Sequence, residues 1–272
     1  MTLDEKFARL RETLARTGGV LVAFSGGVDS TFLAKAAFDV LATKALAVTV
    51  RSQIHPAFEG AEASELARAI GIRHMVVDVD ALAVEGLADN PPERCYICKT
   101  SILGTLKSIA AREGLPAVAE GSNASDEGDF RPGMKAVREQ GVLSPLRDAD
   151  LTKADIRELS RRMGLPTWDK PSYACLASRI PYGEKITPEK LRSIEAAEEM
   201  LRKSGYRMFR VRHHGKLARI ELAPDEMKRF LAEEDLADVA RRMKALGFAY
   251  VTLDLEGYRT GSLNEVLKEK TK

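Results

Sequence analysis

The chain has 272 residues, 44% hydrophobic and 30% charged, which is enough for one large or two modest domains with a substantial core. Its net charge of +2 provides no strong attraction to nucleic acid, and its longest apolar runs are far too short to cross a membrane. The N-terminus does not resemble a signal peptide, and three cysteines are too few for a disulfide framework. We therefore expect a soluble cytoplasmic protein, with neither a membrane nor a nucleic acid as partner.

Strands and helices alternate along the first part of the chain. Apolar residues at helical spacing predict a helix over 3–16, and a short run of β-formers predicts a buried strand over 20–24. The same criteria give further strands at 45–50, 74–79 and 117–119, and helices at 31–37, 57–70, 100–113 and 152–164. This alternation predicts an α/β fold with a doubly wound parallel sheet over residues 1–184.

The pattern changes after residue 184. The expected elements are a helix at 188–203, strands at 207–212 and 217–222, helical segments over 225–245 and a strand at 248–253. We interpret residues 185–272 as a small α+β domain for substrate binding or oligomerisation. The preceding stretch, 168–183, has two prolines and no clear period, and we expect an ordered functional loop that closes the first domain.

Residues 25–30, Ser-Gly-Gly-Val-Asp-Ser, lie between the first predicted strand and the helix that follows. Strand, glycine turn and helix form the geometry in which backbone N–H groups converge on an anion. Gly26 and Gly27 let the backbone approach a phosphate without a Cβ in the way. Ser25 and Ser30 offer hydroxyl groups, and Ser30 is also placed to cap the helix.

Asp29 distinguishes this loop from other phosphate-binding turns. A carboxylate would repel a phosphate unless a divalent cation lay between them, so the loop predicts Mg²⁺ together with a nucleotide. The Gly-Lys-Ser/Thr ending of a Walker A loop is missing. Residues 25–30 resemble the signature of the PP-loop, or N-type, ATP pyrophosphatases, which cleave ATP between the α and β phosphates. The alternative is an ordinary glycine-rich turn with a helix cap.

Two further strand ends are candidates for nucleotide contacts. Ser52 follows the second strand, at the edge where doubly wound sheets bind ligands. A polar, glycine-rich loop at 120–133 follows the fourth strand, and on its own it could equally be a solvated turn. The PP-loop resemblance implies that Asn123 and Asp126 in this loop lie near the ATP.

Three cysteines carry the remaining chemistry. Cys95 and Cys98 form a Cys-x-x-Cys pair, and Cys175 lies far away in the sequence. The pair alone could be a redox pair, half of a zinc site or incidental. Arg94, Lys99 and Arg179 flank these cysteines, and nearby cations favour the thiolate. A structural zinc site requires four ligands, and the chain has only three cysteines. Three thiolates on a [4Fe–4S] cluster leave one iron open, and that iron can carry a hydrosulfide.

The chain is similar to the LarE family of ATP-dependent sulfur transferases. The segments that carry this resemblance are 25–30, 94–99, 121–133, 171–183, 210–215 and 218–221. It implies adenylylation of a carboxylate of pyridinium-3,5-biscarboxylic acid mononucleotide and its conversion to a thiocarboxylate. That reaction belongs to the synthesis of the nickel-pincer nucleotide cofactor of lactate racemase.

The resemblance also implies roles for individual residues. Family members with one cysteine, matching Cys175, sacrifice its sulfur, whereas members with three bind a [4Fe–4S] cluster. Because this chain has all three, we favour the cluster, with ATP and Mg²⁺ as the other cofactors. Arg210 and Arg212 share one face of a strand and suit a mononucleotide phosphate, with a surface salt-bridge patch as the alternative. Glu221 would bind metal or orient those arginines, and Arg179 is also assigned to the substrate.

Partners and rival functions complete the expectations. We expect a sulfide source, transfer of the product to a nickel-inserting enzyme, and a homo-oligomer. The principal rival is a PP-loop tRNA thiolation enzyme, although the charge gives no RNA footprint and no second Cys-x-x-Cys module is present. The other rival is a non-catalytic nucleotide-binding module whose cysteines store iron or sulfur.

Overall fold

The structure is a computed structural model that describes residues 1–126, 132–171 and 174–268. The chain divides into two compact units, Met1–Val84 with Glu93–Tyr173, and Glu85–Pro92 with Ala174–Lys272. The sequence analysis placed the boundary near residue 184, where the helical pattern changes. The loop that contains Cys175 instead belongs to the second unit, because Arg179 in that loop is paired with Glu198 there.

The first unit is built on a parallel sheet. Its strands are β1 (Val20–Ala23), β2 (Ala45–Arg51), β3 (Arg73–Asp78) and β4 (Ala117–Ala119). The strand order is β3-β2-β1-β4, and every pair is parallel. The predicted α/β fold with a parallel sheet is confirmed.

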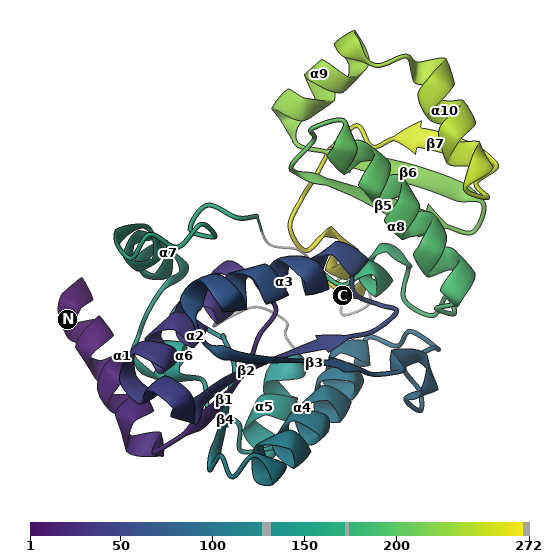
Figure 1. Ribbon diagram of the computed structural model, residues 1–272. Coiled ribbons are helices and arrows are strands. Elements are labelled where there is room, and N and C mark those ends of the chain that lie inside the picture. The colour runs from purple at the N-terminus through teal and green to yellow at the C-terminus, as the bar shows by residue number, and fades with distance from the viewer. Residues whose placement is uncertain (127–131, 172–173, 269–272) are drawn as a thin grey trace. The chain divides into compact units, whose positions relative to one another are not determined.

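Helices cover both faces of this sheet (Figure 1). Val20 and Val22 of β1 face one core, whereas Leu21 faces the other, as the two-residue period of a strand requires. The first core is shared by α1 (Leu3–Thr17), α2 (Val28–Leu41), α3 (Ala57–Ile70), α6 (Pro145–Asp148) and α7 (Lys153–Arg162). The second core is shared by α4 (Arg94–Arg112) and α5 (Gly133–Glu139).

Helix starts follow local chemistry, with one difference from prediction. The capping box expected at Thr152 and Asp155 is present at the start of α7. Helix α4, expected near residue 100, begins at Arg94. Pro91 and Pro92 exclude a helix before that point, and residues 93–112 contain no proline. The Cys-x-x-Cys pair therefore lies within the first two turns of a helix.

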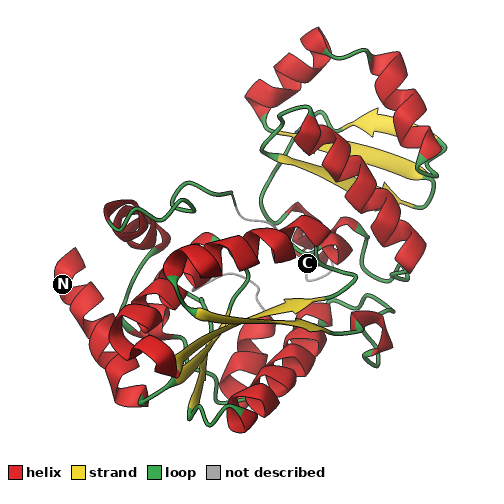
Figure 2. Cartoon of the chain, viewed as in Figure 1, coloured by secondary structure: helices red, strands yellow, loops and turns green. Residues whose placement is uncertain are grey.

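The second unit contains a three-stranded sheet with helices (Figure 2). Its strands β5 (Phe209–His214), β6 (Leu217–Leu222) and β7 (Tyr250–Leu253) lie in that order, with β5 antiparallel and β7 parallel to β6. One core joins this sheet to α8 (Pro188–Lys203), α9 (Pro224–Glu233) and α10 (Leu236–Ala245).

Short helices complete the two units. Helix α11 spans Glu265–Lys268. The 3-10 helices are η1 (Ala42–Lys44), η2 (Ala81–Ala83), η3 (Ala124–Asp126), η4 (Leu176–Arg179) and η5 (Ser262–Asn264). Among the residues that the structure describes, no helix is both long enough and apolar enough to span a bilayer.

Candidate functional site

The loop between β1 and α2 is closed by its own serines. Ser25 N donates to Ser30 Oγ over 3.2 Å, and Gly27 N donates to Ser25 Oγ over 3.3 Å. Gly26 has φ +70°, a conformation that favours glycine. The expected cap at Ser30 is wrong, because Gly27 is the N-cap and Ser30 Oγ bonds within the loop. The first N–H groups of α2 thus have no side-chain cap, which suits an anion at this helix terminus.

Asp29 lies in the first turn of α2 and contacts two other segments of the first unit. Lys153 Nζ, at the start of α7, lies 2.5 Å from Asp29 Oδ2. Asn123 Nδ2 donates to Asp29 Oδ1 over 3.3 Å. The structure therefore brings Asp29 into contact with Asn123, which the sequence had predicted near the ATP. It also brings Lys153 to Asp29, although the sequence indicated only that Lys153 begins a capped helix.

The ends of β1 and β4 meet at the point where the strand order reverses, which is where doubly wound sheets bind ligands. Gly121, just after β4, packs directly against α2. A Cβ at this glycine would lie 3.2 Å from both Asp29 Cβ and Ser30 N. A side chain at residue 121 would therefore displace the loop.

The remaining predicted ATP contacts are held by local bonds. Asn123 N donates to Asp126 Oδ2 over 2.9 Å, so the Asp126 carboxylate closes its own turn. Ser52, after β2, has its hydroxyl 2.9 Å from His55 Nδ1. Burial lowers the pKa of His55 below its usual value, which favours the neutral ring beside Ser52.

Lys170 is a second cation that the sequence analysis missed. Its Nζ donates to Gly26 O over 3.0 Å and to Glu62 Oε2 over 2.8 Å, which ties the glycine turn to α3. Arg157 holds the Lys170 segment through the carbonyls of Trp168 and Lys170. Lys153 follows a helix cap and Lys170 precedes a proline, and both lie in polar stretches of the sequence. In such stretches no hydrophobic period distinguishes a functional charged residue from a solvated one.

The donors around the glycine loop fit a magnesium nucleotide. Asp29 and Asp126 carry carboxylate oxygens, the hard ligands that Mg²⁺ prefers, whereas Asn123 turns its Nδ2 to Asp29 and its Oδ1 to Ser125 N. Lys153 balances the charge of Asp29 and has a flexible stem that can turn toward a phosphate. Across the described ranges, no three His, Cys, Asp or Glu side chains are gathered as a ready metal site.

The Cys-x-x-Cys pair lies at the start of α4, beside the end of β4. Cys95 is exposed and Cys98 is partly buried, and their spacing of three places both on one side of the helix. The neighbouring Lys99 donates to Glu120 Oε2 over 2.7 Å. A Cβ at Gly133 would lie 3.1 Å from Lys99 Cδ, so α5 packs closely on this turn.

Glu120 is the anchor of that turn and is only 5% exposed. Ser144 Oγ donates to Glu120 Oε1 over 2.7 Å. Ser122 donates to the same carboxylate twice, through its N to Oε1 and through its Oγ to Oε2. Burial alone would raise the pKa of Glu120, but the charge of Lys99 and these hydrogen bonds hold it below its usual value. Glu120 is therefore a buried carboxylate with its hydrogen bonds satisfied.

Cys175 lies in the second unit, immediately before η4, and is partly buried. Arg179 Nη1 donates to Ala174 O over 2.6 Å and to Cys175 O over 2.9 Å. The other side of the guanidinium forms a two-point ion pair with Glu198, at 2.8 and 2.7 Å. The backbone of Cys175 is thus bonded to a buried charge pair.

Three charged residues of β5 and β6 lie on the sheet face opposite the apolar core, yet they are buried: Arg210, Arg212 and Glu221. Arg212 makes a two-point ion pair with Glu221, both distances being 2.9 Å, and also donates to Ser178 O and Ser262 Oγ. Arg212 is 7% and Glu221 1% exposed, so this is no surface patch. The structure thus pairs Glu221 with Arg212, and the two roles predicted for Glu221 stay predictions.

Arg210 has a different environment from Arg212. Its guanidinium lies over the Tyr258 ring, 5.0 Å from the centroid, and Nη1 donates to Phe209 O. Burial, and then the positive charge of Arg179, lower the pKa of Arg210 below its usual value. An anion beside Arg210 would relieve both effects.

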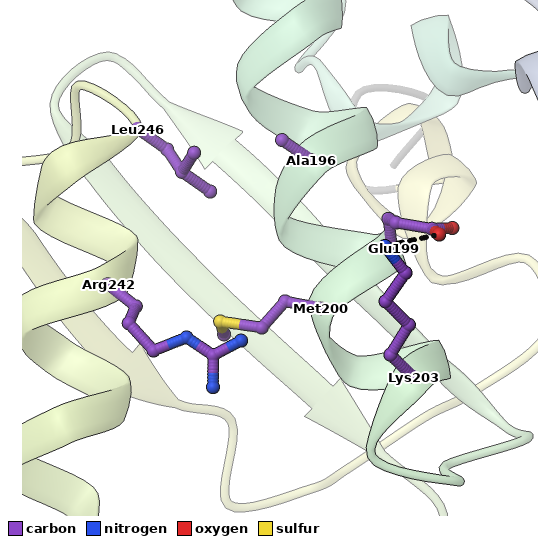
Figure 3. Close-up of a pocket in the computed structure, with 6 residues that line it drawn as sticks. All are labelled: Ala196, Glu199, Met200, Lys203, Arg242 and Leu246. Carbon is purple, nitrogen blue, oxygen red and sulfur yellow. Dashed lines mark ion pairs between the residues drawn. The ribbon is translucent and has the colours of Figure 1, made fainter.

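A cleft of about 320 Å³ lies between α8 and α10 (Figure 3). Apolar side chains and the Glu199–Lys203 ion pair surround it, and Arg242 comes from the facing helix. None of the site residues predicted from the sequence lines this cleft.

Comparisons with known proteins agree with this geometry. The family model described as NAD synthase matches residues 4–90, which include the glycine loop. An uncharacterized protein from Synechocystis is 43% identical over 265 residues, covering 97% of this chain and 99% of that protein. The pyridinium-3,5-bisthiocarboxylic acid mononucleotide synthase of Lactiplantibacillus plantarum is 39% identical over 267 residues, covering 98% of this chain and 96% of the synthase.

A tRNA-specific 2-thiouridylase from Xanthobacter autotrophicus is 29% identical over 200 residues, covering 56% of this chain and 49% of that enzyme. The similarity to the thiouridylase is thus partial, whereas the similarity to the mononucleotide synthase extends over both units. With its glycine loop, parallel sheet and near full-length similarity to that synthase, the chain belongs to the LarE family of ATP-dependent sulfur transferases, within the PP-loop ATP pyrophosphatases.

Proposed function

We propose that this protein adenylylates a carboxylate of pyridinium-3,5-biscarboxylic acid mononucleotide and converts it to a thiocarboxylate, in synthesis of the nickel-pincer nucleotide of lactate racemase. The observation that carries the proposal is the 39% identity to the L. plantarum synthase over 98% of this chain. The partial match to the tRNA thiouridylase, over 56% of the chain, gives weaker support to the tRNA alternative.

In the first step, a substrate carboxylate oxygen attacks the α-phosphorus of ATP, and the bond to the β-phosphate breaks. The N-terminus of α2 and the turn at Gly26 and Gly27 would bind the departing pyrophosphate. Asp29 and Asp126 would hold Mg²⁺, which neutralises phosphate charge when bound, and Asn123 would orient Asp29. Lys153 would turn from Asp29 toward the phosphates.

The substrate phosphate is assigned to Arg210. Its buried cation lies near the positive charge of Arg179, an arrangement that an anion stabilises. Arg212 and Glu221 would support that site from the same sheet face, because their ion pair is already complete within the second unit.

In the second step, a sulfur nucleophile attacks the acyl carbon, and AMP leaves with its bonding electrons. Cys95, Cys98 and Cys175 would hold a [4Fe–4S] cluster, whose open iron carries hydrosulfide when the cluster is bound. The spacing of Cys95 and Cys98 on one side of α4 suits two ligands of one cluster.

One assay distinguishes the cluster from the sacrificial route. The protein is purified without oxygen and is then supplied with ATP, Mg²⁺, substrate and sulfide. The cluster predicts iron and acid-labile sulfide in the protein, repeated turnover, and loss of thiolation in each of Cys95→Ala, Cys98→Ala and Cys175→Ala, while pyrophosphate release persists. The sacrificial route predicts one turnover in Cys95→Ala and Cys98→Ala and a wild-type mass lower by H₂S. Thiolation of tRNA but not of the pyridinium substrate would overturn the proposal.

The cellular context belongs to the same proposal. A sulfide source would reload the protein, and a nickel-inserting enzyme would receive the thiolated product. A homo-oligomeric, cytoplasmic enzyme remains our expectation, and sedimentation velocity of the purified chain tests its oligomeric state.

A further inference from the structure

We infer that Arg179 and Glu198 act together as a clamp that positions Cys175 through its backbone, so that Arg179 serves sulfur transfer without contacting the substrate. The inference rests on the proposed role of Cys175 in sulfur delivery. It departs from our assignment of Arg179 to substrate binding.

The contacts of Arg179 carry the inference. All three guanidinium nitrogens are engaged within the second unit: Nε and Nη2 with Glu198, and Nη1 with the carbonyls of Ala174 and Cys175 and with Ser178 Oγ. The Arg179 side chain is 1% exposed. Its hydrogen-bonding edges therefore face the loop and Glu198.

Glu198 fixes the plane of that guanidinium and links it to the sheet. Its Oε1 also accepts the backbone N–H of Val211, in β5, over 3.0 Å. A continuous series of bonds thus runs from the carbonyl of Cys175 through Arg179 and Glu198 to β5. Arg212, also on β5, donates to the carbonyl of Ser178 in the same turn.

The chemistry needs an arginine at this position. A guanidinium presents donors on two edges in a fixed plane, so one edge pairs with a carboxylate while the other holds two carbonyls. Lysine has one ammonium and cannot keep that geometry. The fully buried guanidinium is stable because the Glu198 carboxylate lies against it.

Sulfur transfer is sensitive to such positioning. A misplacement of a reacting group by about 1 Å can cost roughly a hundredfold in rate. Because Arg179 bonds the backbone carbonyl of Cys175 and not its side chain, the clamp restrains the backbone of a cysteine residue that is itself only partly buried.

The test compares Arg179→Lys, Glu198→Gln and Glu198→Asp with Glu199→Gln. Glu199 is the neighbouring residue on α8 and pairs with Arg202 at a partly exposed site, so it controls for the loss of a carboxylate on the same helix. Hydrogen–deuterium exchange of the 174–183 segment reports the clamp directly. Two amides there, Ser178 N and Ile180 N, are hydrogen-bonded within the turn.

We expect exchange of these amides to rise roughly tenfold or more in Arg179→Lys and Glu198→Gln, and to stay within about twofold of wild type in Glu199→Gln. Thiolation kcat should fall roughly ten- to a hundredfold, with substrate KM and pyrophosphate release unchanged. Glu198→Asp retains the charge and should recover part of the kcat. Its exchange should lie between those of wild type and Glu198→Gln, so it keeps the test valid if Glu198→Gln fails to fold.

A higher substrate KM with unchanged exchange would overturn the clamp and return Arg179 to the substrate site. Unchanged exchange and unchanged kcat would also overturn it. Hydrogen exchange does not depend on the reaction, so the failure of the clamp can be distinguished from failure of the proposed function. If exchange rises as expected but wild-type protein does not thiolate the pyridinium substrate, the clamp stands and the proposed function falls.

Discussion

The Lys99–Glu120 pair offers the sharpest stability prediction, because it links the Cys-x-x-Cys turn to the end of β4. In Glu120→Gln, Oε1 can still accept from Ser122 N and Ser144 Oγ, but an amide NH₂ replaces the oxygen that accepts from Lys99 and from Ser122 Oγ. Removing one partner of a buried ion pair costs about 3–5 kcal/mol. Lys99 is 32% exposed and can regain water, so we expect the free energy of unfolding to fall by about 2–3 kcal/mol.

Urea unfolding followed by the fluorescence of Trp168 measures this loss. Trp168 is the one tryptophan of the chain and belongs to the first unit, so its signal reports the unit that contains Glu120. Glu113→Gln is the matched control, because Glu113 pairs with Arg73 at an exposed site and should cost less than about 1 kcal/mol. A Glu120→Gln change below about 0.5 kcal/mol would refute the anchoring role.

The same pair predicts a pH dependence with a definite sign. The folded-state pKa of Glu120 lies below its unfolded value of 4.5, because the Lys99 charge and the serine hydrogen bonds outweigh burial. The ionised pair therefore stabilises the fold fully above the unfolded pKa and loses that contribution as pH falls through the folded pKa. Glu120→Gln has no charge to lose, so the gap between wild type and Glu120→Gln should narrow on acidification. A gap that widens would contradict the reasoning.

Changes at four further residues test the nucleotide and substrate sites. Asp29→Asn should lower pyrophosphate release at least about a hundredfold with an unchanged circular dichroism spectrum, and ADP plus phosphate as products would show that the cleaved bond is misassigned. Lys153→Met should raise the KM for ATP, whereas Lys153→Arg should retain part of the affinity for ATP. An equal KM for ATP in the two variants would contradict a phosphate-binding role of Lys153. Arg210→Ala should raise substrate KM roughly ten- to a hundredfold and leave ATP KM unchanged. Arg212→Ala should instead cost about 2–3 kcal/mol of stability in the second unit, because the buried Glu221 keeps only the partly exposed Arg219 as its charged partner; thermal unfolding separates the two effects.

Local signals in the sequence were sufficient for the parallel sheet and its glycine loop. The run at Val20–Ala23 is short and β-branched, and the six residues at 25–30 specify a turn and a helix start by their own chemistry. Helix α3 spans Ala57–Ile70 as predicted, since its apolar positions and the glycine that ends it lie within one segment.

Partners distant in the sequence were not predictable in the same way. Lys153 lies 124 residues from Asp29, and Lys170 lies 144 residues from Gly26. Their pairing depends on the tertiary fold, which no local pattern encodes. Arg179 illustrates a related difficulty, because the sequence assigned it to the substrate and gave no sign of Glu198, against which tertiary packing buries it.

The two cysteine-bearing turns are supported by the same physical device. Each has a buried carboxylate, Glu120 or Glu198, that pairs with a cation close in sequence to a cysteine. In both cases the charge pair holds the turn, while Cys95 is exposed and Cys98 and Cys175 are partly buried. In the proposed function, a cysteine that binds iron, or passes sulfur to an acyl adenylate, would need access to its partner and a fixed backbone at once. Buried charge pairs beside the cysteines would meet both requirements, because the ion pairs order the backbone from the interior and the cysteine residues themselves are not buried.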